Sequence, residues 1–215
     1  MSTPYYSDEF VTLYLGDCLE VTEWLAADVL VTDPPYGLGK IMTGGPKWSG
    51  LWSGDGPCNQ SKPQMWDTDA PGWLVPLVDQ FSQAIIWGGN YFDLPPSRGW
   101  LVWDKIVRNF TSGHCELAWS TLDQPIRAFS FSHGQLATEG KLHPTQKPVS
   151  LMEWCIRFTT ADASIADPFA GSGSTLVAAK ALGRHAIGVE LEERYCEIAA
   201  RRLAQDVLDF TGEAS

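Results

Sequence analysis

The sequence predicts an α/β fold with a doubly wound, mostly parallel sheet. Two observations predict it. Short apolar runs such as residues 29–31 and 84–87 lie between turn residues, as in strands that are buried on both faces. In the C-terminal third, stretches with strand and helix character alternate, which is the rhythm of a parallel sheet with crossover helices.

In the first two thirds of the chain we expect strands over residues 11–15 and 28–32 with a helix over 19–25 between them. Residues 37–56 contain seven glycines, so we interpret 37–72 as a mobile loop region. A helix over 71–83 and a strand over 84–87 follow. Further strands are expected over 100–103 and 116–120, and a weaker one over 128–132, inside an irregular segment, 121–142, that suits target recognition.

The last third begins with a helix over residues 148–158, opened by a proline. A strand over 164–166 then leads to Asp167, and a helix over 174–182 is stopped by Gly183. A strand over 186–189 ends at Glu190, and a final helix covers 192–208.

The 215 residues, 44% of them apolar, fit a single domain, 1–215. No apolar run reaches the roughly 18 residues of a membrane span, and the N-terminus lacks a basic segment, so we expect neither membrane insertion nor secretion. The five cysteines are dispersed without zinc-ligand spacing, which predicts no metal site and a reducing, cytoplasmic compartment.

The net charge of −11 argues against a polyanionic partner, but the charge is uneven. Residues 98–157 hold seven basic and five acidic side chains, whereas the chain on both sides is acidic. Phosphates would therefore meet a local basic patch on an acidic body. Its candidate contacts are Arg98, Lys105, Arg108, Arg127 and Lys141.

One glycine-rich turn joins a predicted strand to a predicted helix: Asp167-Pro-Phe169-Ala-Gly171-Ser-Gly173. Such glycines let the backbone approach a ligand at a helix N-terminus. Glu190 ends the next strand, seventeen positions after Gly173, where its carboxylate suits ribose hydroxyls. Leu176 replaces the third glycine of the dinucleotide motif, which disfavours a nicotinamide cofactor. A plain strand-to-helix turn is the alternative interpretation.

A second turn, Asp33-Pro34-Pro35-Tyr36, follows a strand predicted to be buried. Two prolines cannot continue the hydrogen-bond ladder, so the chain leaves the sheet in a stiff turn. That turn can present a carboxylate, a carbonyl oxygen and an aromatic ring to a flat ligand that bears an amino group. A purely structural turn is the alternative. Both turns follow parallel strands, so they are expected to share one cleft.

These motifs occur with further segments in a fixed order: Leu15-Gly16-Asp17-Cys18, Trp103-Asp104-Lys105 with Glu116, His143-Pro-Thr-Gln-Lys147-Pro148, and Val189-Glu190. Together they resemble the amino-methyltransferases of DNA, in the permuted class called β, where Asp-Pro-Pro-Tyr precedes the cofactor motif. The resemblance implies a Rossmann-like fold that binds S-adenosylmethionine, with a small recognition insertion.

Carried over to this chain, the resemblance implies that S-adenosylmethionine lies against the turn that contains Asp167, Phe169, Gly171 and Gly173. It further implies that Glu190 binds the ribose, Asp17 the adenine of the cofactor, and Lys147 with Pro148 the methionine end. The catalytic residues would be Asp33, Pro34, Pro35 and Tyr36, which hold a base flipped out of the duplex. Methyl transfer would be a direct in-line displacement, so catalysis is chiefly positioning and electrostatics.

The expected reaction is methylation of adenine N6 in double-stranded DNA. The residues expected to contact nucleic acid are Lys47, Trp48, Arg108 and Arg127. The resemblance also brings a homodimer and a cognate restriction endonuclease into consideration as partners. Three alternatives stay open: an N4-cytosine enzyme, an RNA base methyltransferase, and a regulator that binds the cofactor without catalysis.

Overall fold

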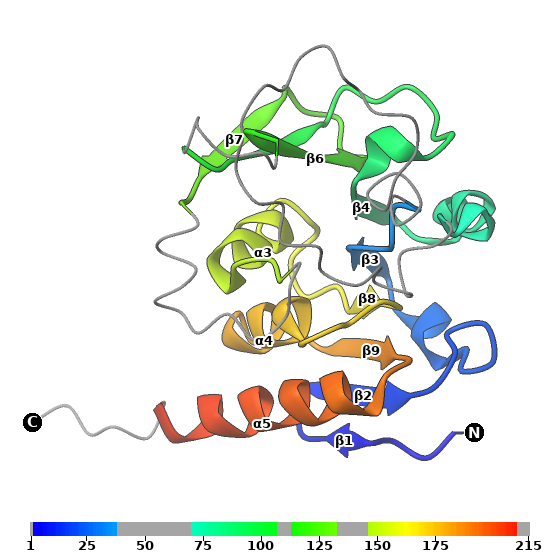
Figure 1. Ribbon diagram of the computed structural model, residues 1–215, viewed down its shortest axis with the longest axis vertical. Helices are drawn as coiled ribbons and strands as arrows, with labels where there is room; N and C mark the ends of the chain where they lie inside the picture. The colour runs from blue at the N-terminus through cyan, green and yellow to red at the C-terminus, as the bar shows by residue number, and fades with distance from the viewer. Residues whose placement is uncertain (1, 38–69, 107–112, 133–145, 210–215) are drawn as a thin grey trace, which may run out of the picture.

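The structure, a computed structural model, describes residues 2–37, 70–106, 113–132 and 146–209, the last four without their side chains. Within these residues one sheet has the strand order β1-β2-β9-β8-β3-β4-β6-β5-β7 (Figure 1). The strands are β1 (Tyr6–Ser7), β2 (Val11–Leu15), β3 (Val29–Thr32), β4 (Gln83–Trp87), β5 (Leu101–Asp104), β6 (Cys115–Ser120), β7 (Arg127–Ser130), β8 (Ile165–Asp167) and β9 (Ala186–Glu190).

The centre of the sheet is parallel. Strands β2, β9, β8, β3 and β4 pair in that order, each parallel to its neighbour. Beyond β4 the direction changes, because β6 runs antiparallel to both β4 and β5, while β7 is parallel to β5. The short β1, which the sequence did not predict, adds an antiparallel edge to β2. The predicted α/β fold with a mostly parallel sheet is confirmed.

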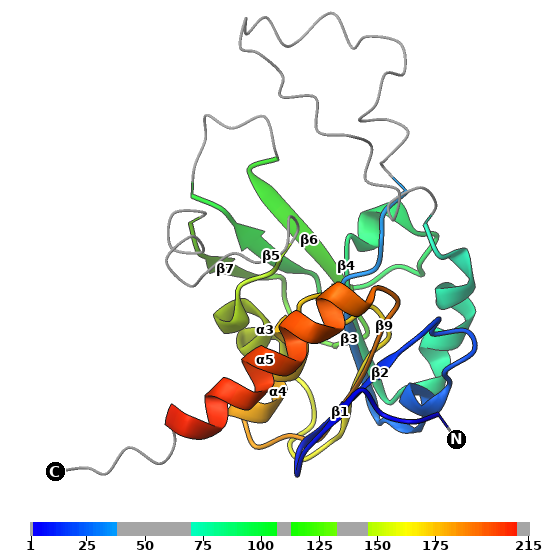
Figure 2. The same ribbon diagram turned by 60° about the horizontal axis from the view of Figure 1, so that its bottom comes forward.

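Both faces of the sheet are covered, which explains why its central strands are apolar runs without polar alternation. Val29 and Val31 of β3 belong to the core that includes α3 (Val149–Ile156), α4 (Ser174–Ala181) and α5 (Glu193–Asp209). Leu30 between them packs on the opposite face with Trp24 and Leu74. Figure 2 shows the three α-helices on one side of the sheet and the 3₁₀ segments of residues 23–26 and 72–80 on the other.

Two predicted α-helices are wrong in type. The stretch 19–25 is a turn followed by the 3₁₀-helix η1 (Glu23–Ala26), and 71–83 is the 3₁₀-helix η2 (Gly72–Gln80) followed by a strand. Pro76 lies inside η2 and has no amide hydrogen, so it cannot extend an α-helical ladder. In the first stretch, burial of Trp24 decides the geometry, since its ring N–H donates to the Cys18 carbonyl. A short 3₁₀-helix η3 (Gly89–Tyr91) follows β4.

Several predictions fall on residues outside the described ranges. Lys47, Trp48 and Arg108 lie there, as do 38–69 of the expected loop and 133–142 of the expected recognition segment. The described part of that segment includes β7, on which Arg127 is exposed. Among the helices that the structure describes, none is long and apolar enough to cross a membrane, and its described residues form no metal-binding cluster of His, Cys, Asp or Glu.

Candidate functional site

A cavity of about 310 Å³ opens where the central parallel strands end. Five carboxylates line it. Four of them lie at the carboxyl ends of different strands: Asp17 after β2, Asp33 after β3, Asp167 at the end of β8 and Glu190 at the end of β9; the fifth, Glu192, lies just before α5. Parallel strands bring such residues to one edge of the sheet, where ligand sites of α/β proteins lie. The two motif turns therefore share one cleft, as predicted.

Glu190 is tied to the glycine-rich turn. One carboxylate oxygen accepts a 2.8 Å hydrogen bond from the Gly171 amide, and the other accepts one of equal length from the Glu192 amide. Burial raises the pKa of Glu190, although these two amides oppose the shift. The Glu190 carboxylate, which is predicted to bind a ribose, thus also holds the glycine-rich turn that would surround this ribose.

The two glycines of the turn have different roles. Gly171 lines the cavity, with a positive φ of 53°. Gly173 is not among the lining residues; it precedes α4 with a φ of 80°, and a Cβ there would come within 2.8 Å of the Ala199 side chain on α5. Gly173 therefore allows the turn to pack against α5 and serves the cavity only indirectly. Phe169 lines the cavity beside Trp73 of η2, with their ring centroids 5.8 Å apart.

Asp167 is fully buried and joins two strand ends. Its Oδ1 accepts hydrogen bonds from the Thr32 hydroxyl at 2.7 Å and from the Phe169 amide at 3.1 Å. Burial raises its pKa to about 6. Asp17, in contrast, is exposed at the rim, where its carboxylate accepts the Leu19 amide at 2.9 Å.

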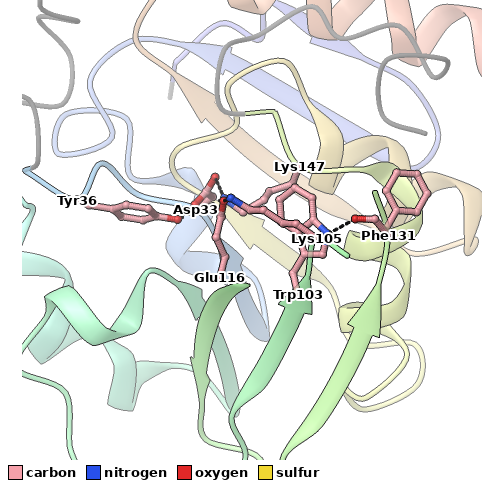
Figure 3. Close-up of polar contacts among 7 residues, drawn as sticks. All are labelled: Asp33, Tyr36, Trp103, Lys105, Glu116, Phe131 and Lys147. Carbon is pink, nitrogen blue, oxygen red and sulfur yellow. Dashed lines mark hydrogen bonds and ion pairs between the residues drawn. The ribbon is translucent and has the colours of Figure 1, made fainter. Parts of the chain in front are cut away.

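The Asp33 turn presents both carboxylate oxygens to polar partners (Figure 3). The Tyr36 hydroxyl donates to Oδ1 at 2.5 Å, and the Lys147 ammonium donates to Oδ2 at 2.5 Å. Asp33 and Pro35 line the cavity, and Pro34 is buried. The Tyr36 ring stacks on Tyr91 of η3 with ring centroids 5.1 Å apart. Burial, countered by Lys147, raises the pKa of the Asp33 carboxyl.

Lys147, expected in the wall beside the methionine end of the cofactor, lines the cavity. Its Nζ also lies between two carboxylates, Asp33 and Glu116, the latter at 3.1 Å. Burial disfavours the charge of Lys147, but these carboxylates outweigh it and raise its pKa well above the usual value. Pro148 does not line the cavity; it is the N-cap of α3.

Sequence reasoning expected Lys105 to contact phosphate, noticed Glu116 without giving it a role, and missed Trp73 and Tyr91. Lys105 Nζ forms a 2.6 Å ion pair with Glu116 Oε1. Although burial opposes ionisation, Lys147 and Lys105 lower the pKa of Glu116 to about 2. Lys105 is only 6% exposed, so it is not available to a DNA phosphate as expected. A buried position next to an acidic residue on a neighbouring strand cannot be read from composition.

Comparison with known proteins gives the family. The N6_N4_Mtase model, described as DNA methylase, matches residues 86–201, more than half of the chain. The putative methylase YubD of Escherichia coli is 32% identical over 207 residues, covering 88% of each chain. This chain belongs to the N6/N4 family of DNA methylases. The matched range contains Glu116, Lys147 and the glycine-rich turn.

Other relatives of this DNA methylase are longer. Type II methyltransferase M.HindIII of Haemophilus influenzae is 32% identical over 137 residues, which is 61% of this chain and 43% of M.HindIII. M2.DpnII of Streptococcus pneumoniae is 52% identical over 62 residues, which is 28% of this chain and 23% of M2.DpnII. This chain therefore spans less than half of either relative.

Two solved structures share the fold. The crystal structure of the M1.HpyAVI–SAM complex has a TM-score of 0.58 and 21% identity, covering 90% of this chain and 98% of that one. PvuII DNA methyltransferase, described as cytosine-N4-specific, has a TM-score of 0.59 and 16% identity, covering 97% and 93%. At these identities the likeness establishes the mixed α/β fold with a large, mostly parallel sheet.

Proposed function

We propose that this chain transfers a methyl group from S-adenosylmethionine to the N6 amino group of adenine in double-stranded DNA. The single observation behind the proposal is that one cavity is lined by both Asp33 and Pro35 and by the Gly171 turn with Glu190. A donor of methyl groups and an amino acceptor would thus meet inside one cleft. Because the Asp33 turn precedes the glycine-rich turn in the chain, we assign it to the permuted class β.

The cavity has the chemistry that S-adenosylmethionine requires. Glu190 and Asp17 offer carboxylate oxygens for hydroxyl and amino groups, and Phe169 with Trp73 provides an aromatic wall for an adenine ring. Gly171 leaves room for backbone approach. When bound, this cofactor supplies a methyl group on a positively charged sulfur.

The acceptor side suits an amino group on a flat ring. Asp33 and the Pro34 carbonyl would accept the two amino hydrogens, and Tyr36 would stack on the base. A base inside the duplex cannot reach this turn, so it has to flip out. Bound S-adenosylmethionine would supply the methyl group to the amino nitrogen and leave as a neutral thioether that keeps the electron pair of the broken carbon–sulfur bond. The nitrogen would pass its surplus proton to solvent. The protein contributes by orienting the nitrogen and stabilising its developing positive charge with the Asp33 carboxylate.

The test is methyl transfer from tritium-labelled S-adenosylmethionine to duplex DNA, followed by digestion to nucleosides and mass spectrometry. We expect N6-methyldeoxyadenosine. N4-methyldeoxycytidine would replace the adenine assignment with the cytosine alternative, and acceptance by structured RNA but not DNA would replace the DNA assignment. Binding of the cofactor without transfer to any of these acceptors would support the regulator instead.

The matched variant for this test is Asp33→Ala. Because Asp33 faces the acceptor, its loss should abolish transfer while calorimetry gives cofactor affinity within about threefold of wild type. Wild-type transfer by this variant would remove Asp33 from the site.

A homodimer and a cognate restriction endonuclease stay predictions of the resemblance. Sedimentation would test the first, and co-expression would test the second.

A further inference from the structure

Four charged side chains form a continuous row of ion pairs beside the acceptor turn: Lys105, Glu116, Lys147 and Asp33 (Figure 3). The two lysines are buried, and the two carboxylates are partly exposed. Lys105 follows β5, Glu116 lies on β6, Lys147 precedes α3 and Asp33 follows β3, so four separate segments meet here. The contacts are 2.6 Å from Lys105 to Glu116, 3.1 Å from Glu116 to Lys147 and 2.5 Å from Lys147 to Asp33. The lysines are 6% and 5% exposed.

A contribution to folding stability is a poor explanation for this row of ion pairs. Removing ions from water costs several kcal/mol for each ion, and well-packed apolar side chains often replace buried ion pairs without loss of stability. The lysines are also held in place by aromatic side chains. Lys105 Nζ lies 5.2 Å from the centroid of Trp103, whose ring N–H donates to the Phe131 carbonyl, and Lys147 Nζ lies 5.4 Å from the centroid of Trp87.

Asp33 has to pair with Lys147 and also accept a hydrogen bond from the substrate, and the arrangement of charges allows both. If Lys147 paired with Asp33 alone, the ammonium would neutralise the carboxylate that has to accept the target amino group. Instead Lys147 divides its hydrogen bonds among Asp33, Glu116 and the Tyr36 hydroxyl, the last at 3.3 Å. Glu116 in turn uses one oxygen for each lysine.

Resting on the function proposed above, we propose that Glu116 is a positioning residue that draws Lys147 partly away from Asp33, and that Lys105 limits how strongly it does so. Asp33 then keeps enough negative charge to accept the hydrogen bond of the incoming amino group. The pair Lys105–Glu116 thereby sets the strength of Asp33 as an acceptor without touching the substrate.

The titration of Asp33 reports this balance. The groups that act on it are Lys147 and Tyr36, which donate to it, and the carboxylates Glu116 and Asp167. Removing the Glu116 charge should lower the pKa of Asp33, because a like charge is lost and Lys147 is left to Asp33. Removing the Lys105 charge should raise it, because Glu116 then competes harder for Lys147. A shift of about one unit is reasonable for one charge at this range.

The experiment compares Glu116→Gln with Lys105→Met, which should move the titration in opposite directions. The Asp33 carboxyl is followed by ¹³C NMR in carbon-labelled protein and assigned by the signal lost in Asp33→Asn. The acid limb of kcat for methyl transfer is measured in parallel. We expect it to move to lower pH in Glu116→Gln, with a maximal rate reduced at least tenfold, and to higher pH in Lys105→Met.

Glu197→Gln and Arg201→Met make the same charge changes in an exposed ion pair of α5 and should leave both titrations in place. The double variant Lys105→Met/Glu116→Gln removes one positive and one negative charge, so its net charge is unchanged. It serves as the replacement if a single variant fails to fold. Because Lys105 acts through Glu116, Asp33 in the double variant should titrate as it does in Glu116→Gln.

Shifts of the same sign in the two single variants, or no shift, would overturn the proposal. The NMR titration needs no turnover. Opposite shifts in a protein that methylates nothing would therefore reject the proposed function and leave the charge sharing intact, whereas methyl transfer without the shifts would reject only the charge sharing.

Discussion

Among single residues, Glu190 has two roles in the site. Its oxygens accept the Gly171 and Glu192 amides, which fixes the glycine-rich turn, and its carboxylate also lines the cavity. Each carboxylate oxygen can accept a second hydrogen bond, so a ribose hydroxyl can bind without breaking either amide contact. The strand end thus organises the turn before any ligand binds.

We predict that Glu190→Ala weakens S-adenosylmethionine binding by about 10- to 150-fold, the equivalent of roughly 1.5–3 kcal/mol for a hydrogen bond to a charged group. Isothermal titration calorimetry measures the change. Glu193→Ala, which removes an exposed carboxylate at the start of α5, is the control and should bind like wild type. Equal affinities in all three proteins would contradict the pocket assignment.

At the element scale, the turns after the strands hold the site together. Gly88 lies directly after β4 in the left-handed region, with φ of 67°, and a Cβ there would collide with the Tyr36 ring. The backbone of Gly88, after β4, thus lies directly against the ring of Tyr36, after β3. Tyr91 of η3 stacks on the same ring. Tyr36 is positioned by its neighbouring strand as much as by its own turn.

We predict that Gly88→Ala destabilises the protein and strongly reduces methyl transfer, because it displaces Tyr36. Gly183→Ala is a matched control: its φ of 66° imposes the same backbone strain, about 1–2 kcal/mol, but a Cβ there meets nothing within 4 Å. Thermal unfolding and transfer rates measure both effects. Equal transfer rates in the two variants would mean that the Tyr36 contact is unimportant.

The bond between Thr32 and Asp167 joins the ends of β3 and β8. Burial of the Asp167 carboxyl makes stability depend on pH, and the Thr32 bond opposes the resulting rise of its pKa. The pKa of Asp167 is about 6 in the folded protein, above its usual 3.8. Between these pH values the folded protein binds a proton that the unfolded chain has lost, so this group favours folding at low pH. That contribution is lost as pH rises from about 4 to about 6.

Thr32→Val removes a donor to the carboxylate at nearly constant volume. We predict a cost of about 1.5–3 kcal/mol at pH 7, where Asp167 is charged, and a smaller cost at pH 4.5, where it is protonated. Urea unfolding at both pH values measures it. Thr12→Val, on β2 of the same sheet, serves as the control. A cost that grows on acidification would show that the sign of this linkage is wrong.

At the scale of the whole molecule, the basic middle of the chain is less available to DNA than its composition indicates. Of its seven basic residues, Lys105 and Lys147 are buried in ion pairs, and Arg98 and Arg157 pair with Asp123 and Glu153. Arg127 on β7 is exposed. Few phosphate contacts are therefore expected from the described part of this stretch, on a body of net charge −11.

We predict a shallow salt dependence of duplex binding, with a slope of about −3 in log K against log salt for about three phosphate contacts. Arg127→Ala should flatten the slope by about one unit and leave cofactor affinity unchanged. Fluorescence anisotropy across a salt series measures the slope. Arg201→Ala, on α5, should keep the wild-type slope. An unchanged slope in Arg127→Ala would remove β7 from the DNA interface.

Sequence patterns alone are sufficient to predict the fold class and to place the two motif turns at one edge of the sheet. Apolar runs identify strands buried on both faces, and parallel strands place their carboxyl ends at one edge. Asp33, Asp167 and Glu190 were therefore predictable, since each lies at the end of such a strand. A local sequence pattern is sufficient to predict these positions, because the end of a buried strand can be recognised from the residues next to it.

The contacts of these side chains could be found only in the folded chain. Lys147 lies 114 positions from Asp33 in the chain, and no periodicity relates it to Glu116 on β6. Helix type in η1 likewise goes with the burial of Trp24, and Gly173 packs on α5. The physical reason is that buried charges and close packing are satisfied by whichever segments the folded chain brings together, and sequence distance does not encode that choice.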